Sequence, residues 1–261
     1  MRWTPADAAT MLRPPAEEDD KYSRGVLGVR TGSEMYPGAA VLSVEAALRT
    51  GVGMVRYLGP QRAADLVLQR RPEVVTADGR VQAWLLGSGM DAQARDTAPL
   101  LAALRQGLPT VLDGGALDLH DRASGPLILT PHHRELSRIV GADSAAITAE
   151  PERWAVAAAE ALGATVLLKG HTTFVAGGGE LLTVSEATPW LATAGAGDAL
   201  GGILGALLAT AGEEPDTVRI AATAAVVHGL ASQRASAGGP LTVLDLCAAV
   251  PAVIADLLAG A

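Results

Sequence analysis

The chain has almost no cysteine and very few aromatic residues. Its 261 residues include one cysteine and one phenylalanine, and aromatic residues make up only 3% of the total. A single cysteine, Cys247, excludes an internal disulfide and any metal site built from several cysteines. The core must therefore consist of Ala, Val, Leu and Ile, which suits helices packed closely on a parallel sheet. Cys247 lies in an apolar helical pattern, so we expect it to be buried rather than reactive.

The sequence also lacks a long apolar run and an excess of positive charge. No stretch reaches the length of a transmembrane helix, and the N-terminal region contains no signal-peptide core. We therefore expect no membrane partner and a cytoplasmic location. The formal net charge of −8 argues against nucleic-acid binding, which needs a clustered cationic surface. A hydrophobic fraction of 49% with 18% charged residues is typical of a globular domain.

The segment from Thr193 to Gly202 combines a glycine-rich turn with the start of a helix. Helical spacing is shown by the apolar residues Leu200, Ile203, Leu204, Leu207 and Leu208, so a helix is predicted to begin near Asp198. Its first N–H groups lack helical partners, and Gly195 and Gly197 would let a phosphate approach them closely. The Asp198 carboxylate would suit removal of a proton from an alcohol during phosphoryl transfer. Aspartate is also favoured in a first helical turn by the helix dipole alone, so this segment leaves both interpretations open.

Strand-like and helix-like segments alternate along the rest of the chain. This alternation predicts one doubly wound α/β domain with a mostly parallel sheet and helices on both faces. The predicted strands are 26–29, 52–58, one near Val74, 84–86, 110–113, 127–130 and 165–169, with a hairpin of 174–176 and 181–184. The predicted helices are 39–49, 61–69, 97–105, 152–162, 216–234 and 243–258, besides the one at Asp198.

Two further features concern organisation. Residues 1–20 are proline-rich and then acidic, which predicts a loosely ordered N-terminal arm ahead of a single domain over residues 21–261. Several predicted strands end in Gly, Asp or Pro/His turns. Because ligands bind at the carboxyl ends of strands in open parallel sheets, these turns are expected to line one crevice.

Taken together, the motifs resemble those of the ribokinase-like superfamily, and within it the ADP- or ATP-dependent NAD(P)H-hydrate dehydratases. The resemblance covers nearly the whole chain. It rests on the segments 21–25, 32–33, 36–40, 49–55, 129–132, 168–170, 192–198 and 227–229.

Three segments depart from the family pattern. Gly87-Ser88-Gly89 stands where the family has Gly-Pro-Gly, and Asp113-Gly114-Gly115-Ala116 where it has Asp-Ala-Asp-Ala, which removes one carboxylate. The segment 187–191, Ala-Thr-Pro-Trp-Leu, replaces Gly-Asn-Pro-Gly-Met and changes the approach to the central turn. These differences bear on substrate handling and rate rather than on nucleotide use.

The resemblance implies a metabolite-repair reaction that restores NADH or NADPH from a form hydrated at C6 of the nicotinamide ring. A phosphoryl group from ADP or ATP would be transferred to the C6 hydroxyl, and phosphate would then leave. Asp198 would be the catalytic base and would also contact the substrate. The nucleotide-binding residues implied are Lys169, Gly170, His171, Thr172, Thr173, Gly195, Ala196 and Gly197. The substrate-binding residues implied are Ala39, Ala40, Gly89 and His132.

The resemblance also implies Mg²⁺ arriving with the nucleotide, no protein-held metal, and a homo-oligomer, a tetramer in the family. Simple structural roles compete with two of the site assignments. Lys169 would otherwise be a solvated strand-end charge, and His132 a helix-start residue after Pro131. His228 is expected to lie on a helix with its side chain packed against neighbouring residues, rather than to act in catalysis. Two other functions remain open: a small-molecule kinase of the same superfamily, and a nucleotide-binding protein without activity.

Overall fold

One mixed sheet runs through the protein, with strand order β2-β1-β3-β4-β5-β6-β7-β8. The computed structural model describes residues 1–260, and within them the neighbouring strands from β2 to β6 are parallel, whereas β7 is antiparallel to both β6 and β8. The strands are β1 Val26–Arg30, β2 Met54–Tyr57, β3 Ala83–Leu86, β4 Thr110–Leu112, β5 Leu127–Leu129, β6 Thr165–Leu168, β7 Thr173–Gly177 and β8 Glu180–Val184. The predicted parallel sheet and the predicted hairpin are both confirmed.

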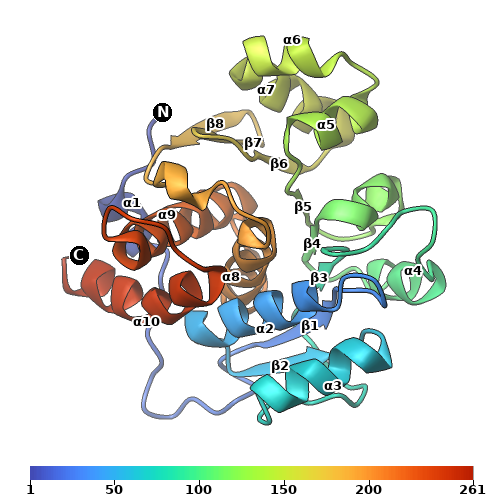
Figure 1. Cartoon of the computed structure of the whole chain (residues 1–261), viewed down its shortest axis with the longest axis vertical. Helices are drawn as coiled ribbons and strands as arrows, with labels where there is room; N and C mark the ends of the chain where they lie inside the picture. The colour runs from blue at the N-terminus through green and yellow to red at the C-terminus, as the bar shows by residue number, and fades with distance from the viewer. Residues whose placement is uncertain (261) are drawn as a thin grey trace.

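Helices cover both faces of the sheet (Figure 1). One face carries α1 Pro5–Ala9, α2 Gly38–Thr50, α3 Gln61–Arg70, α8 Ala196–Thr210, α9 Thr217–Ser236 and α10 Val243–Ala259. The other carries α4 Ala98–Leu104, the 3₁₀ helix η1 Gly114–Arg122, α5 His133–Val140, α6 Ser144–Ala149 and α7 Pro151–Leu162. Successive strand residues point to opposite faces, so Leu85 packs in the first core and Leu86 in the second. Both sides of the strands are buried, which explains their nearly continuous apolar sequences.

The expected loose arm over residues 1–20 is wrong for its first part. Trp3 is only 4% exposed, and its Nε1 donates a hydrogen bond to Thr223 Oγ1 over 3.2 Å. The Trp3 backbone N donates to Thr183 O on the edge strand β8, and the capping box of Thr4 and Asp7 starts helix α1. Composition alone suggested an arm because prolines and acidic residues follow, whereas one buried tryptophan and the cap fix the segment.

Several local predictions also need correction. Val74 is not in a strand, because only one isolated bridge, between Arg56 and Val75, forms there. The elements η1, α5 and α6, and the 3₁₀ turn η2 at Pro189–Leu191, were not predicted. They are short or weakly periodic segments, for which the apolar spacing gives little signal. The helix predicted to begin near Asp198 is confirmed, and its first residue is Ala196.

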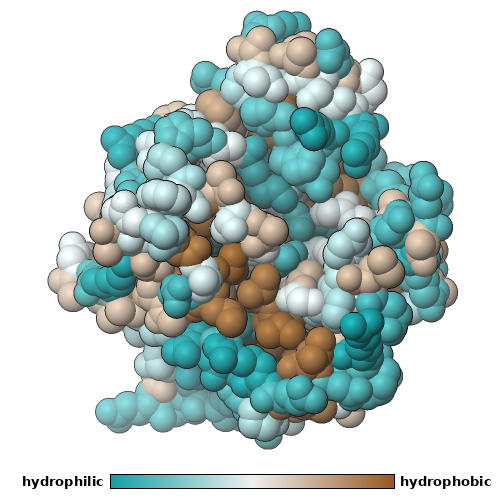
Figure 2. Space-filling model, viewed as in Figure 1, coloured by the Kyte–Doolittle hydropathy of each residue, from teal (hydrophilic) through white to brown (hydrophobic). Residues whose placement is uncertain are grey.

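Six strands, β1 to β6, end at the same edge of the sheet. The parallel pairing of β1, β3, β4, β5 and β6 places the turns after them side by side, as expected from the sequence. Figure 2 shows a recess near the centre of this face with hydrophilic residues inside it.

Cys247 is buried, and burial raises the pKa of its thiol to about 12, which confirms an unreactive cysteine. Within residues 1–260, no helix is both long enough and apolar enough to cross a bilayer.

Candidate active site at the carboxyl edge of the sheet

The glycine-rich turn leads directly into helix α8. Gly195 is the N-cap residue and has φ +90°, and a Cβ there would lie 2.5 Å from Leu42 Cδ1 of helix α2. Both facts require glycine, because a side chain would be strained by the backbone and would collide with α2. No side chain caps this helix. The Ala196 N–H makes a long hydrogen bond of 3.4 Å to Thr193 O, and the N–H groups of Gly197 and Asp198 are available to an anion.

Asp198 lies in the first turn of α8 and is held in an environment suited to a base. Burial raises the pKa of its carboxyl to about 6, and the charge of Asp113 acts in the same direction while Lys169 opposes it. A carboxyl group with this pKa is ionised at neutral pH and yet more basic than an exposed aspartate.

Lys169 follows strand β6 and reaches into the same place. Its Nζ lies 2.7 Å from Asp113 Oδ1 and 3.8 Å from Glu135 Oε2, and its side chain is 21% exposed. Burial alone would lower the pKa of this ammonium group, but the charges of the surrounding carboxylates raise it above its ordinary value. Lys169 is therefore a fixed cation and not the solvated strand-end charge considered from the sequence.

Asp113 is the buried partner of that lysine. Its Oδ1 also accepts a hydrogen bond from Thr130 Oγ1 over 2.7 Å, and its Oδ2 accepts one from Ser88 Oγ over 2.9 Å. Burial raises the pKa of a carboxyl, but Lys169 and the two hydroxyl donors outweigh that effect and lower the pKa of Asp113. The carboxylate thus stays ionised and joins the ends of β3, β4, β5 and β6.

The glycine turn and the lysine are close neighbours. A Cβ on Gly197 would lie 3.5 Å from Lys169 Nζ, and one on Gly195 would lie 3.8 Å from Asp198 Oδ2. A Cβ on Gly201, one turn further along α8, would lie 3.6 Å from Ser88 Oγ. The structure therefore brings together one base, one cation and a row of backbone N–H groups.

The remaining residues predicted to bind nucleotide form the turn after Lys169. Gly170 and His171 are exposed, Thr172 is half-buried, and Thr173 begins strand β7. A Cβ on Gly170 would lie 3.4 Å from His133 Nε2, so helix α5 borders this turn. The turn is accessible beside the N-terminus of α8, and its nucleotide-binding role stays a prediction.

Three of the residues predicted to bind substrate meet at the start of α2. Ala39 and Ala40 are buried in its first turn, and Gly89 lies in the turn after β3. A Cβ on Gly89 would come within 2.3 Å of Ala39 Cβ, and Gly89 has φ +68°. Only glycine fits there. These small residues allow a close approach to the backbone near Ser88 and Asp113.

His132 lies beside Lys169 but also has a structural role. It caps helix α5, because its Nδ1 accepts a hydrogen bond from the Glu135 N–H over 3.1 Å, while Glu135 Oε2 accepts one from the His132 N–H over 2.8 Å. An isolated backbone bridge joins His132 to Lys169. The His132 side chain is half exposed, so a ligand could reach it while it caps α5. Its substrate contact stays a prediction.

His228 supports the central helix from within α9. It is 7% exposed, and its Nε2 lies 2.9 Å from the Ala196 carbonyl oxygen. Burial lowers the pKa of its imidazole to about 4, so the ring is neutral at pH 7 and Nε2–H donates to that carbonyl. The sequence-based expectation of a packed histidine is confirmed.

Two of the family departures have local explanations. Ser88 uses its hydroxyl to bind Asp113, which a proline at this position would not do. Gly115 stands where the family has a second aspartate, and a Cβ there would lie 2.3 Å from the Met90 carbonyl oxygen. The local backbone therefore excludes that carboxylate. Trp190 of the third departure is half exposed and donates from its indole to Gly238 O over 3.3 Å.

Neither Asp113 nor Glu135 was predicted from the sequence to be a site residue. Asp113 carried a usable signal, since an aspartate directly after a buried strand in a parallel sheet falls at the ligand edge. Glu135 carried a different one, the N3 position of a capping box, which points to helix capping and not to a site. Its proximity to Lys169 arises only from the folding of α5 beside β6.

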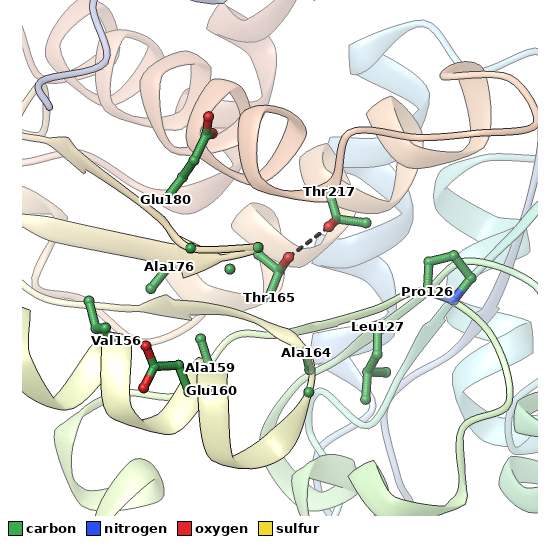
Figure 3. Close-up of a pocket in the computed structure, with 14 residues that line it drawn as sticks. Pro126, Leu127, Val156, Ala159, Glu160, Ala164, Thr165, Ala176, Glu180 and Thr217 are labelled. Carbon is green, nitrogen blue, oxygen red and sulfur yellow. Dashed lines mark hydrogen bonds between the residues drawn. The ribbon is translucent and has the colours of Figure 1, made fainter.

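Most of the cavities in the structure lie away from this cluster. The one in Figure 3 is at the opposite edge of the sheet, where β5 and β6 begin, and has a volume of about 480 Å³. Thr165 Oγ1 and Thr217 Oγ1 lie 2.7 Å apart in its wall, and Glu160 and Glu180 also line it. It contains neither a base near a cation nor a glycine turn at a helix start. Among residues 1–260, no group of three or more His, Cys, Asp or Glu side chains is arranged to hold a metal ion.

Comparison with known proteins identifies the family. A family model described as NAD(P)H-hydrate dehydratase matches residues 27–249. The chain belongs to the NAD(P)H-hydrate dehydratase family.

Individual relatives agree with this assignment. The chain is 42% identical over 221 residues to a bifunctional NAD(P)H-hydrate repair enzyme of Mycobacterium leprae, covering 78% of this chain and 45% of that protein. It thus spans about half the length of the bifunctional relatives. An ADP-dependent (S)-NAD(P)H-hydrate dehydratase of Xanthomonas campestris is 33% identical over 222 residues, covering 76% of this chain and 77% of that protein.

A solved structure shows the same fold. The ADP/ATP-dependent NAD(P)H-hydrate dehydratase of Bacillus subtilis, co-crystallised with ATP and Mg²⁺, superposes with a TM-score of 0.90 at 24% identity, covering 98% of each chain. This likeness confirms the ribokinase-like fold.

Proposed function

We propose that the protein dehydrates the C6 hydrate of NADH or NADPH, using ADP or ATP as phosphoryl donor. The observation that carries the proposal is the convergence of Asp198, Lys169 and the free N-terminus of α8 at one point of the carboxyl edge. A base for a hydroxyl proton, a cation for phosphate and a row of N–H donors are what phosphoryl transfer to an alcohol requires.

The reaction follows from the chemistry of the leaving group. Hydroxide leaves poorly, so Asp198 would take the C6 hydroxyl proton while the hydroxyl oxygen attacks the terminal phosphorus of the nucleotide. The bond from that phosphorus to the bridging oxygen breaks, leaving AMP from ADP or ADP from ATP. The lone pair of the ring nitrogen then expels phosphate from C6, and loss of the proton from the adjacent carbon gives the reduced nicotinamide.

The residues of the site would have separate roles in this reaction. The N–H groups at Gly195, Ala196 and Gly197 would hold the oxygens of the transferred phosphoryl group, and Lys169 would stabilise the same charge. Gly170 to Thr173 would contact the rest of the nucleotide, while Ala39, Ala40, Gly89 and His132 would hold the hydrate. Mg²⁺ fits only as an ion carried by the phosphates, because Asp113 and Glu135 face Lys169.

One assay tests this function against its nearest alternative. Hydrated NADH and hydrated NADPH are each incubated with ADP or ATP, and the absorbance of the reduced nicotinamide ring is followed. If this absorbance returns at the same rate as phosphate is released, the result supports the dehydratase function. A stable phosphoester without that absorbance would instead indicate a kinase, and no turnover of either hydrate would indicate nucleotide binding without catalysis.

Replacing Lys169 should weaken nucleotide binding more than it slows the chemical step. In Lys169→Ala we expect the Kd for ADP and ATP to rise at least about tenfold, since hydrogen bonds to charged groups contribute about 1.5–3 kcal/mol. The ammonium charge acts on the phosphates already in the ground state. Calorimetric titration measures this, with Lys21→Ala as the control because Lys21 is an exposed lysine. Unchanged affinity for both nucleotides would remove Lys169 from the site.

The pH dependence of the reaction should report Asp198. Burial raises its pKa to about 6, and the base acts only when deprotonated. We therefore expect kcat/KM to be constant above about pH 7 and to fall about tenfold per pH unit well below pH 6. Initial rates between pH 5 and pH 8 measure this, with the pH stability of the hydrate determined separately. A profile that stays flat down to pH 5 would contradict the role of Asp198 as the base.

A homo-oligomer, a tetramer by family resemblance, and a cytoplasmic location are further predictions. Light scattering coupled to size-exclusion chromatography would measure the first.

A further inference from the structure

A second cavity lies directly beside the candidate active site. Its volume is about 650 Å³, within the usual range for small-molecule sites, and it opens at the carboxyl ends of β1, β2 and β3. Its walls include Arg30, Gly32, Tyr36, Met90 and Arg95. No residue of the catalytic cluster lines it, so the reaction described above does not account for it.

The cavity shares a wall with the predicted substrate positions. The Gly32 N–H donates to Ser88 O over 2.7 Å, and a Cβ on Gly89 would lie 3.3 Å from Gly32 Cα and 3.2 Å from Tyr36 O. Gly89 also contacts Ala39, while Met90 follows it into the cavity wall. Gly89, Ala39 and the loop from Gly32 to Tyr36 therefore form a closely packed wall that the predicted substrate positions and this cavity share. A dinucleotide that extends from the reacting centre past Gly89 would follow this wall to the cavity.

The strand order indicates which part of the dinucleotide lies in this cavity. The nucleotide turn follows β6, and the catalytic cluster joins the ends of β3 to β6. When the nicotinamide ring of a dinucleotide lies at Asp198, its adenosine must lie elsewhere. It cannot lie on the β6 side, because ADP occupies that side. The open direction leads toward β1 and β2, where the cavity lies.

The walls suit an adenosine. Met35 is 81% exposed and Tyr36 61%, which is unusual for large hydrophobic side chains that border a cavity. Leu58 and Pro60 add further apolar surface to the lining. A flat aromatic base would pack against these surfaces, since thioethers and phenol rings stack well on π systems.

One buried donor in the wall has no partner. The Arg95 side chain is 5% exposed, its Nη2 lies 2.8 Å from Asp118 Oδ2, and its Nη1 donates to the Gly115 carbonyl. Its Nε has no hydrogen-bond partner among the described residues. A buried unpaired donor is costly, but this atom has almost no exposed surface, so a ligand in the cavity would reach it only after the Arg95 side chain moved.

The charges of the cavity favour a neutral ribose. Three carboxylates, Glu34, Asp91 and Asp96, line it and are exposed. Arg95, one of its two cations, pairs with Asp118. The other, Arg30, donates to the Leu58 carbonyl, and the charges of Asp78 and Asp96 act on it. A 2′-phosphate would bring about two further negative charges, whereas a ribose 2′-hydroxyl would donate a hydrogen bond to a carboxylate.

We propose that this cavity holds the adenosine half of the hydrated dinucleotide and that its carboxylates select the hydrate of NADH over that of NADPH. The inference rests on the proposed function for the identity of the dinucleotide. It adds a binding subsite and a preference that the catalytic cluster does not determine.

The first test is equilibrium binding of the two reduced dinucleotides. Calorimetric titration of the intact protein with NADH and with NADPH should give a Kd at least about tenfold lower for NADH. Equal affinities, or tighter binding of NADPH, would overturn the proposed preference. Because this measurement needs no turnover, it is decisive even for an inactive protein.

Two variants locate the effect. In the double variant Asp91→Asn/Asp96→Asn, NADPH should bind more tightly and the ratio should fall to within about threefold. NADH should bind less than about threefold more weakly, because the amide oxygen still accepts the hydrogen bond of the 2′-hydroxyl, although without the charge. Tyr36→Ala should weaken both dinucleotides about tenfold, the usual loss for a base stacked on an aromatic ring. The matched control is Glu160→Gln, in the cavity at the opposite edge of Figure 3. Variants that bind both dinucleotides as the wild type does would overturn the subsite.

Turnover separates this proposal from the proposed function. If both hydrates are dehydrated with equal kcat/KM and the binding ratio is near one, the function stands and the preference fails. If neither hydrate is turned over but NADH binds preferentially through Tyr36, the subsite stands and the dehydratase function fails.

Discussion

Asp198→Asn should lose at least about 10²-fold in kcat for hydrated NADH, the usual contribution of a general base. Asparagine has nearly the shape of aspartate and preserves the fold of the first turn of α8, but it cannot accept the hydroxyl proton. Since the carboxylate opposes rather than favours the approach of phosphate, ADP should bind at least as tightly as in the wild type. Steady-state rates and calorimetric titration with ADP measure the two effects separately.

The matched control is another aspartate in a first helical turn. Asp245 belongs to the capping box of α10, outside the site, and its Oδ2 accepts hydrogen bonds from Thr242. Asp245→Asn should cost about 1 kcal/mol of stability at most and leave kcat unchanged. If Asp198→Asn behaves like this control, Asp198 is only a helix-start residue and the central turn is only a phosphate cradle.

Replacing Asp113 should destabilise the protein strongly. Asp113→Ala removes the buried partner of Lys169 and leaves the ammonium group without its nearest carboxylate and the Ser88 and Thr130 hydroxyls without their acceptor. Breaking one half of a buried ion pair costs about 3–5 kcal/mol. Urea unfolding at pH 7 measures the change, with Asp256→Ala as the control, because the Asp256–Arg234 pair is exposed and should contribute about 1 kcal/mol or less.

The same variant has a defined pH dependence. The folded-state pKa of Asp113 is lowered, so its stabilising contribution is fully present above the unfolded pKa of about 3.9 and is lost as the pH falls through the folded value. The stability difference between wild type and Asp113→Ala should therefore shrink below about pH 4. A difference that is small at pH 7, or that does not change on acidification, would contradict an ionised buried pair.

Much of the fold was predictable because its signals are local. Apolar strand runs bounded by glycine, and the helical spacing of Leu200, Ile203 and Leu207, depend on neighbouring residues alone. The N-terminal segment was not predictable in this way. Its order depends on Trp3 meeting Thr223 on α9, a contact between residues more than 200 positions apart.

The candidate site was predictable as a set of motifs but not as an arrangement. Lys169 and Asp198 stand in recognisable segments, whereas the role of Asp113 follows from a parallel register that aligns the end of β4 with those of β3 and β5. The raised pKa of Asp198 likewise depends on burial and on the charge of Asp113. Neither burial nor register can be obtained from one segment of the sequence.

An oxygen label distinguishes transfer of a phosphoryl group to the C6 hydroxyl from direct loss of that hydroxyl as water. NADH hydrate prepared in ¹⁸O-labelled water carries the label on its C6 oxygen, and it is then turned over by the protein with ADP in ordinary water. If the hydroxyl oxygen attacks phosphorus and leaves with it, each inorganic phosphate released contains one ¹⁸O, in equal amount to the NADH formed. Unlabelled phosphate alongside newly formed NADH would mean that the hydroxyl leaves as water, and it would contradict the mechanism.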